Sequence, residues 1–128
     1  MTKRLLIIDD EPAISRLIER VAVGCGYSVT VTAEPDHFMD ELISAEPDLI
    51  VLDLSLPTMD GVELLRFLAT SKCRCQILIV SGFDARVLDT TRSLGEALGL
   101  RIAGTLNKPI RVSELRDALS ALEVGANS

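Results

Sequence analysis

Short runs of aliphatic residues recur along this chain at nearly regular intervals. The segments between them are roughly 12 to 20 residues long, and their apolar side chains follow one another at steps of three and four residues, as on one face of a helix. The runs are Leu5–Ile8, Val29–Val31, Leu49–Leu52, Ile77–Val80 and Ile102–Leu106. The pattern predicts a strand followed by a helix, repeated five times.

Proline and glycine mark the ends of several predicted helices. Pro12 suits the first turn of a helix, and Gly24 and Gly26 lie past the expected end of the same helix. The longest connection runs from Gly82 to Leu100, and its helix should end at Gly99. The first helix is expected to begin at Pro12 and to end before Gly24, and three others are expected at about residues 35–45, 61–70 and 112–122. Val87, Leu94, Ala97 and Leu98 mark the helix in the longest connection.

Uninterrupted apolar runs such as "LIVL" and "ILIV" are typical of strands that are covered on both faces. A parallel sheet with helices on each side provides this cover. The expected fold is therefore α/β: a single domain built on a doubly wound, five-stranded parallel sheet. We expect this domain to occupy residues 1–123, with residues 124–128 forming a flexible tail or the start of a linker.

Amino-acid composition and net charge exclude several kinds of binding partner, but they say less about the fold. The chain has 128 residues, 48% of them hydrophobic, which is enough for one complete core. Its formal net charge of −6 disfavours direct binding to nucleic acid, which needs clustered Lys and Arg. No apolar run approaches the roughly 20 residues that span a bilayer, and the start lacks a signal-peptide cleavage site. We expect a cytoplasmic protein that contacts no membrane.

Chemically active side chains follow the predicted strands. In a doubly wound sheet, ligands bind beyond the carboxyl ends of the strands. Asp9 and Asp10 follow the first strand, and Asp53, Ser81 and Lys108 stand at the ends of the third, fourth and fifth. The predicted fold thus brings three acids, a hydroxyl and an ammonium group together from distant parts of the chain.

Each of these residues has an ordinary structural explanation when taken alone. Asp10 could cap the first helix, Asp53 could be a loop acid at a strand end, and Lys108 could be a solvated side chain. Their joint placement favours a site, because carboxylates held together stay ionised beside a divalent cation or a fixed ammonium group. Carboxylates, a backbone carbonyl and phosphate oxygens are ligands that suit Mg²⁺.

Phosphoryl transfer is the reaction that accounts best for this set of residues. The carboxylate of Asp53 can attack a phosphoryl group and form an aspartyl phosphate, while Mg²⁺ and Lys108 neutralise charge on the phosphoryl oxygens. Ser81 can donate its hydroxyl to the same group. Because a carboxylate is already ionised at neutral pH, this reaction needs no general base.

Four blocks of sequence resemble those of receiver domains from bacterial two-component response regulators. They read "LLIIDDEP", "DLIVLDLSLPTMDG", "LIVSG" and "NKP" in the family's order, and the resemblance extends from Lys3 to Leu122. It implies a flavodoxin-like (βα)5 fold with strand order 2-1-3-4-5. It also implies a switch, rather than an enzyme with turnover of its own, that a histidine kinase or histidine phosphotransfer protein phosphorylates.

The resemblance further implies a role for each site residue. The roles are phosphoacceptor for Asp53, metal ligand for Asp9, Asp10, the Asp53 side chain and the Ser55 backbone carbonyl, switch hydroxyl for Ser81, and phosphate-binding cation for Lys108. Phosphorylation is expected to change the face formed by the fourth helix and the fifth strand. The signal would then pass to an output domain or a downstream protein.

The chain departs from the family pattern at two places. Thr105 stands three residues before Lys108, where family members usually carry a Tyr or Phe that turns inward with the switch hydroxyl. We expect Thr105 to take part in the switch, although a β-branched residue also simply suits a strand. The stretch from Ser81 to Lys108 is about five residues longer than is usual. Its lengthened segment "LGEALGLRIAGTLNKP" resembles receivers attached to cyclic-diguanylate phosphodiesterase domains.

Two other functions stay open at this point. A degenerate receiver would bind a partner without being phosphorylated, and Thr105 is the residue that favours this alternative. A phosphatase of the haloacid-dehalogenase type would also use a strand-end Asp, Mg²⁺, a hydroxyl and a Lys. Such a phosphatase needs a second Asp two residues after its nucleophile, where this chain has Ser55.

Overall fold

A five-stranded parallel sheet forms the centre of the computed structural model, which describes residues 3–32, 37, 40–42, 44, 46–54, 61–71, 75–82 and 84–125. The strands are β1 (Lys3–Ile8), β2 (Tyr27–Thr32), β3 (Leu49–Asp53), β4 (Gln76–Ser81) and β5 (Arg101–Asn107). They lie side by side in the order β2-β1-β3-β4-β5. This arrangement confirms the predicted fold class and the strand order that the resemblance implied.

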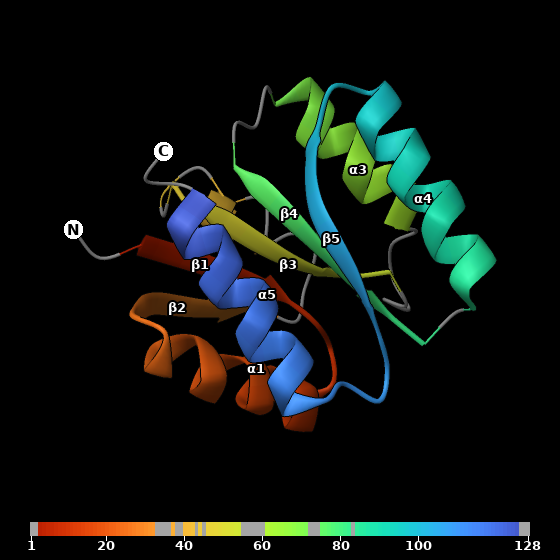
Figure 1. Ribbon diagram of the computed structural model, residues 1–128. Helices are drawn as coiled ribbons and strands as arrows, with labels where there is room; N and C mark the ends of the chain where they lie inside the picture. The colour runs from red at the N-terminus through yellow and green to blue at the C-terminus, as the bar shows by residue number, and fades with distance from the viewer. Residues whose placement is uncertain are drawn as a thin grey trace.

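Helices cover both faces of the sheet (Figure 1). α1 (Pro12–Gly24) and α5 (Val112–Gly125) lie on one face, and α3 (Gly61–Thr70) and α4 (Ala85–Ala97) lie on the other. Successive side chains of a strand point to opposite faces, and this alternation divides the core into two clusters. In β1, for example, Ile7 packs with α1 and α5, whereas Ile8 packs with α3 and α4.

The predicted elements agree closely with the observed ones. Each strand extends beyond its apolar run, so that Asp53 and Ser81 are the last residues of β3 and β4. α5 continues to Gly125, and the division into a domain at 1–123 and a tail at 124–128 stays a prediction. Of the helix predicted at 35–45, residues 37, 40–42 and 44 are helical, and the others lie outside the described residues. Within the described part of the chain, none of the helices has the length and apolar character that a membrane span requires.

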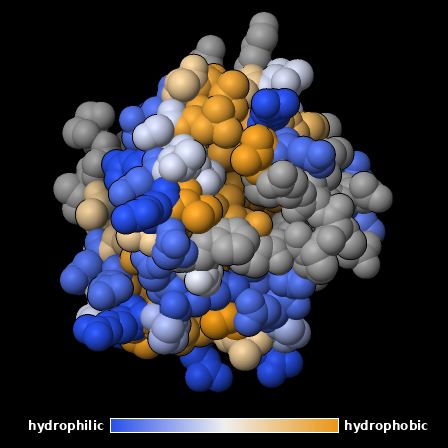
Figure 2. Space-filling view, turned by 90° about the vertical axis from the view of Figure 1, so that its right-hand side faces the viewer, coloured by the Kyte–Doolittle hydropathy of each residue, from blue (hydrophilic) through white to orange (hydrophobic). Residues whose placement is uncertain are grey.

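The face of α4 that packs against the sheet differs from the face that its predicted apolar positions, such as Val87 and Leu98, indicated. Val87 and Leu98, the residue that follows α4, are 42% and 36% exposed. Figure 2 looks onto the side of the molecule that lies at the right of Figure 1, where α4 is, and hydrophobic surface gathers there. The buried residues of α4 are Leu88, Thr91 and Gly95. A Cβ atom at Gly95 would lie 2.8 Å from the Cδ1 atom of Ile102 in β5. The missing side chain of Gly95 therefore allows α4 to approach β5 closely.

One irregularity in β5 determines on which face of the sheet the side chains near its carboxyl end lie. The pairing of β4 with β5 shifts between Ile77 and Leu78 and leaves Ala103 as an extra residue in β5. Such a bulge moves the residues after it to the opposite face of the strand. Thr105 consequently pairs with Ile79 of β4, on the side that α3 and α4 cover.

Candidate functional site

The carboxyl ends of four strands bring the predicted site residues to one edge of the sheet. Asp9 directly follows β1, while Asp53 and Ser81 end β3 and β4. Lys108 directly follows β5, and its amide donates a hydrogen bond of 2.9 Å to the carbonyl oxygen of Ser81. This bond holds the ends of β4 and β5 together next to the acids.

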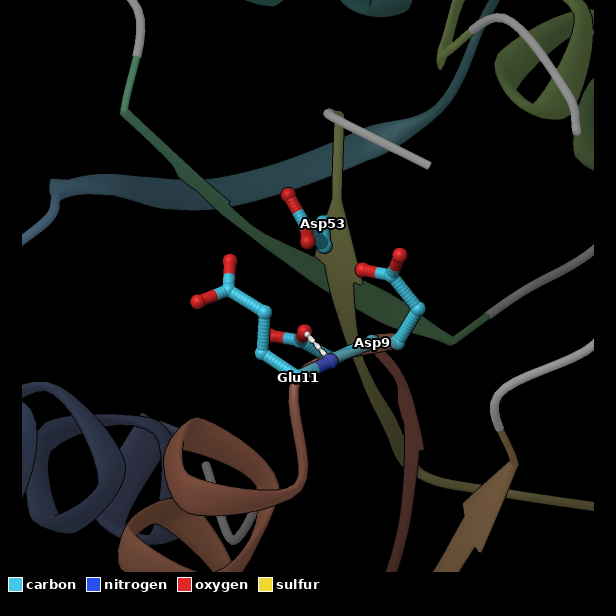
Figure 3. Close-up of side chains that lie close together, drawn as sticks. Asp9, Glu11 and Asp53 are labelled. Atoms are coloured by element: carbon cyan, nitrogen blue, oxygen red, sulfur yellow. Dashed lines mark hydrogen bonds between the residues drawn. The ribbon is translucent and has the colours of Figure 1, made fainter. Parts of the chain in front are cut away.

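Four carboxylates meet at this edge. Asp9, Asp10, Glu11 and Asp53 each offer an oxygen atom, and these atoms all lie within 4.8 Å of one another. Figure 3 shows that Asp9 and Glu11 reach this place from the end of β1 and Asp53 from the end of β3. Asp9 and Asp53 are 2% and 1% exposed, whereas Asp10 and Glu11 are exposed. The cluster therefore has a buried base and an open rim.

The ammonium group of Lys108 supplies a positive charge to this cluster. Its Nζ atom lies 2.6 Å from Glu11 Oε1, 3.1 Å from Asp53 Oδ2 and 3.7 Å from Asp9 Oδ2. Burial alone would lower the pKa of Lys108, but hydrogen bonds to Glu11 and Asp53 and the charges of Asp9 and Asp53 together raise it above its ordinary value. Lys108 is therefore a fixed positive charge at neutral pH.

Asp9 has one buried oxygen atom that is not satisfied. Its Oδ1 atom accepts a hydrogen bond of 2.8 Å from the Glu11 amide, the bond drawn in Figure 3. Its Oδ2 atom is buried and has no hydrogen-bond partner among the described residues. Burial raises the pKa of Asp9 to about 6, with a further upward contribution from the charge of Asp53, against the lowering effects of the Glu11 amide and Lys108. A divalent cation would satisfy such an oxygen atom, and carboxylate oxygens are ligands that fit Mg²⁺.

The predicted site residues are brought together wherever the structure describes them. Ser81 is fully buried, and Thr105 is half-buried on the face of the sheet that α3 and α4 cover. Ser55, whose backbone carbonyl was expected to bind the metal, lies outside the described residues. The alternative explanation of Asp10 as a helix cap is wrong, because Glu11 occupies the N-cap position of α1 and makes no side-chain capping bond.

Glu11 is the site residue that the sequence analysis missed. The sequence shows it only as the third acid, after Asp9 and Asp10, of the block "LLIIDDEP". The signal that could have found it is Pro12, since a proline at the first helical position places the preceding residue at the turn between β1 and α1, beside the strand ends. From that turn the Glu11 carboxylate reaches Lys108, 97 positions further along the chain.

Asp9→Asn should stabilise the metal-free protein at neutral pH. The pKa of Asp9 in the folded protein, about 6, lies above its ordinary value of 3.8, so the unfolded chain loses this proton first and stability falls as the pH rises between these two values. The advantage of Asn should therefore be small near pH 4 and reach roughly 1 to 3 kcal/mol above pH 7. Urea unfolding in EDTA at the two pH values measures it. The same advantage at both pH values would contradict this account.

Comparisons with known proteins agree with this geometry. The family model for the response regulator receiver domain matches residues 5–120. The chain is 28% identical over 124 residues to the alkaline phosphatase synthesis transcriptional regulatory protein PhoP of Bacillus subtilis. This match covers 95% of the present chain and 49% of PhoP. The chain is 27% identical over 120 residues to the sporulation initiation phosphotransferase F of the same species, with 93% and 92% of the two chains covered.

Solved structures show the same architecture. A crystal structure of a response regulator from Colwellia psychrerythraea matches with a TM-score of 0.84 and 29% identity, and the match covers 98% of this chain and 99% of that one. The chain thus spans about half the length of PhoP but nearly the whole of the other two proteins.

Proposed function

The chain belongs to the family of response regulator receiver domains, and on this premise we propose that Asp53 is the residue that accepts the phosphoryl group. The domain is a phosphorylation-controlled switch of a two-component system, and the family implies a histidine kinase or a phosphotransfer protein as its partner. The observation that carries the proposal is the position of Asp53. Its carboxylate is buried at the end of β3, with Oδ2 3.1 Å from the Lys108 ammonium group.

In the proposed reaction, one carboxylate oxygen of Asp53 attacks the phosphorus atom of the donor. A new P–O bond forms while the bond from phosphorus to the leaving group breaks, and the leaving group keeps the electron pair. The leaving group is the imidazole of a phosphohistidine or, with a small donor, acetate. The product is an aspartyl phosphate, and attack by water later returns the carboxylate and inorganic phosphate.

The residues around Asp53 support this chemistry. Lys108 already contacts Asp53, and its positive charge can stabilise the phosphoryl oxygens without rearrangement of the backbone. We propose that Asp9, Asp10, the Asp53 side chain and the Ser55 backbone carbonyl hold Mg²⁺. When bound, Mg²⁺ supplies further positive charge to the phosphoryl oxygens. The buried Oδ2 atom of Asp9, which has no hydrogen-bond partner among the described residues, supports this choice of ligands.

Ser81 and Thr105 are the proposed link between the phosphoryl group and the surface. Ser81 pairs with Asn107, and Thr105 pairs with Ile79, so both residues belong to the face of the sheet next to α4. A hydrogen bond from the Ser81 hydroxyl to a phosphoryl oxygen would move the end of β4 relative to β5. Thr105 is smaller than the usual aromatic residue, so we expect the change to pass through the strand pairing rather than through a rotating ring.

A function without phosphorylation is not favoured, because the acids and the lysine of the site are all present and in contact. Several finer expectations stay predictions. They are an output through a cyclic-diguanylate phosphodiesterase domain or another downstream protein, a cytoplasmic location, and the lack of direct contact with nucleic acid.

Incubation with acetyl phosphate and Mg²⁺ should add one phosphoryl group to the protein. Intact-mass spectrometry should show a gain of about 80 Da, and replacing Mg²⁺ with EDTA should prevent it. Hydroxylamine should remove the added mass, because it cleaves acyl phosphates and leaves phosphoserine intact. A gain that survives hydroxylamine, or no gain with Mg²⁺ present, would contradict the proposal.

A further inference from the structure

We propose that Glu11 is a positioning residue that pairs with Lys108 in the unphosphorylated protein and gives up this contact when a phosphoryl group arrives. The inference rests on the proposed role of Asp53. It concerns the affinity of the site for anionic groups, because Glu11 and the phosphoryl group would compete for the same ammonium group. Glu11 would thereby favour the unphosphorylated state.

The contacts of Lys108 show why Glu11 is the exchangeable partner. Its Nζ atom is closer to Glu11 Oε1, at 2.6 Å, than to Asp53 Oδ2, at 3.1 Å. The Glu11 side chain is 53% exposed, whereas the side chain of Asp53 is 1% exposed. Glu11 can therefore turn into water at little desolvation cost, which the buried Asp53 cannot do.

The backbone of Glu11 is held in place, so only its side chain has to move. Its amide donates a hydrogen bond of 2.8 Å to Asp9 Oδ1, and its carbonyl oxygen accepts one of 3.0 Å from the amide of Ser15 in the first turn of α1. Among the described residues, Lys108 is the partner of its carboxylate. Release of Glu11 thus disturbs neither β1 nor α1.

Charge provides the reason for the release. The phosphoryl group carries a charge of about −1.5 to −2, but the Asp53 carboxylate loses its own negative charge when the acyl phosphate forms, so the negative charge next to the ammonium group grows by roughly one half to one unit. The Lys108 ammonium group has three N–H donors. Asp53, which is buried, would hold the phosphoryl oxygens within reach of these donors. The Glu11 carboxylate would then face a like charge at close range in a partly buried site, and the open rim lets it move away.

Binding of a phosphoryl analogue tests the competition. Glu11→Gln keeps the size of the side chain and removes its charge, so titration with beryllium fluoride in the presence of Mg²⁺ should show affinity three- to tenfold higher than that of wild type, equivalent to about 0.7 to 1.4 kcal/mol. Glu19→Gln removes the same charge further along α1 and should leave the affinity unchanged. Equal or weaker binding in Glu11→Gln would overturn the proposal. If the wild type binds no beryllium fluoride, the proposed function of Asp53 fails instead.

A second measurement reports on the contact itself, without phosphorylation. The chain contains three lysines, Lys3, Lys72 and Lys108, so the 15Nζ signals of a lysine-labelled sample are few, and Lys108→Arg identifies the one needed. Glu11→Gln should shift the Lys108 signal and speed the exchange of its ammonium protons, whereas Glu19→Gln should not. A Lys108 signal that is the same in Glu11→Gln and wild type would overturn the proposal, whatever the fate of Asp53.

Discussion

Asp53→Asn should abolish phosphorylation, with the 80 Da mass gain falling to less than roughly 1% of the wild-type level. The amide has nearly the shape of the carboxylate but lacks its negative charge and is a very poor nucleophile. Asp53 is 1% exposed at the end of β3, and Asn can occupy the same space without disturbing the strand pairing. Intact-mass spectrometry after incubation with acetyl phosphate and Mg²⁺ measures the loss.

The control for this variant is Asp89→Asn, which removes a carboxylate from the exposed surface of α4 and should be labelled like wild type. Asp53→Asn should also remain folded, because the substitution removes the repulsion between Asp53 and Asp9, the two carboxylates that are buried at this edge among the described residues. Undiminished labelling of the folded Asn variant would mean that another residue accepts the phosphoryl group.

Lys108→Ala should have two large effects. Without the ammonium group, the buried carboxylates of Asp9 and Asp53 lose a cation that lies 3.7 Å and 3.1 Å away, and the metal-free protein should lose about 3 to 5 kcal/mol of unfolding free energy at neutral pH. Phosphorylation should slow roughly ten- to hundredfold, since the same charge stabilises the phosphoryl oxygens. Urea unfolding and the rate of mass gain measure the two effects.

Lys108→Arg separates charge from shape in this experiment. Arg keeps the positive charge, so the Lys108→Arg variant should lose much less unfolding free energy than the Lys108→Ala variant. Addition of Mg²⁺ should restore part of the stability of Lys108→Ala, because a bound cation replaces the missing charge beside Asp9 and Asp53. A metal-free Ala variant as stable as wild type would show that the acids are not held by Lys108.

The fold and most of the site were predictable because their signals are local. A buried parallel strand needs an apolar residue at every position, so runs such as "LIVL" identify the strands without knowledge of their neighbours. The carboxyl ends of parallel strands then meet by geometry alone. This places Asp9, Asp53, Ser81 and Lys108 together, although their separation along the chain is large.

The orientation of α4 was not predictable in the same way. Its large apolar residues, among them Val87 and Leu98, predicted the buried face, but the structure leaves these two side chains exposed. The close approach at Gly95 depends on where Ile102 lies in the neighbouring strand, after the pairing of β4 with β5 has already shifted by one residue. A contact that involves a missing side chain and a bulge leaves no apolar signal in the sequence.

The pairing of Glu11 with Lys108 was missed for a related reason. Strand periodicity predicts what lies at the end of β1 but not how the chain turns into α1. That turn depends on Pro12 and on the bond from the Glu11 amide to Asp9. The structure of this turn is needed to show that the Glu11 carboxylate contacts Lys108 in addition to solvent.

The division of the core by the sheet has a consequence for how the molecule can open. The two apolar clusters share no side chain, and α4 contributes only Leu88 to the one on its side among the residues described. Elements with few buried apolar contacts unfold locally at a lower free energy than the whole domain. We therefore expect α4 to unfold locally at a lower free energy than the rest of the domain, while the cluster beneath α1 and α5 keeps β1, β3 and the acids at their ends in place.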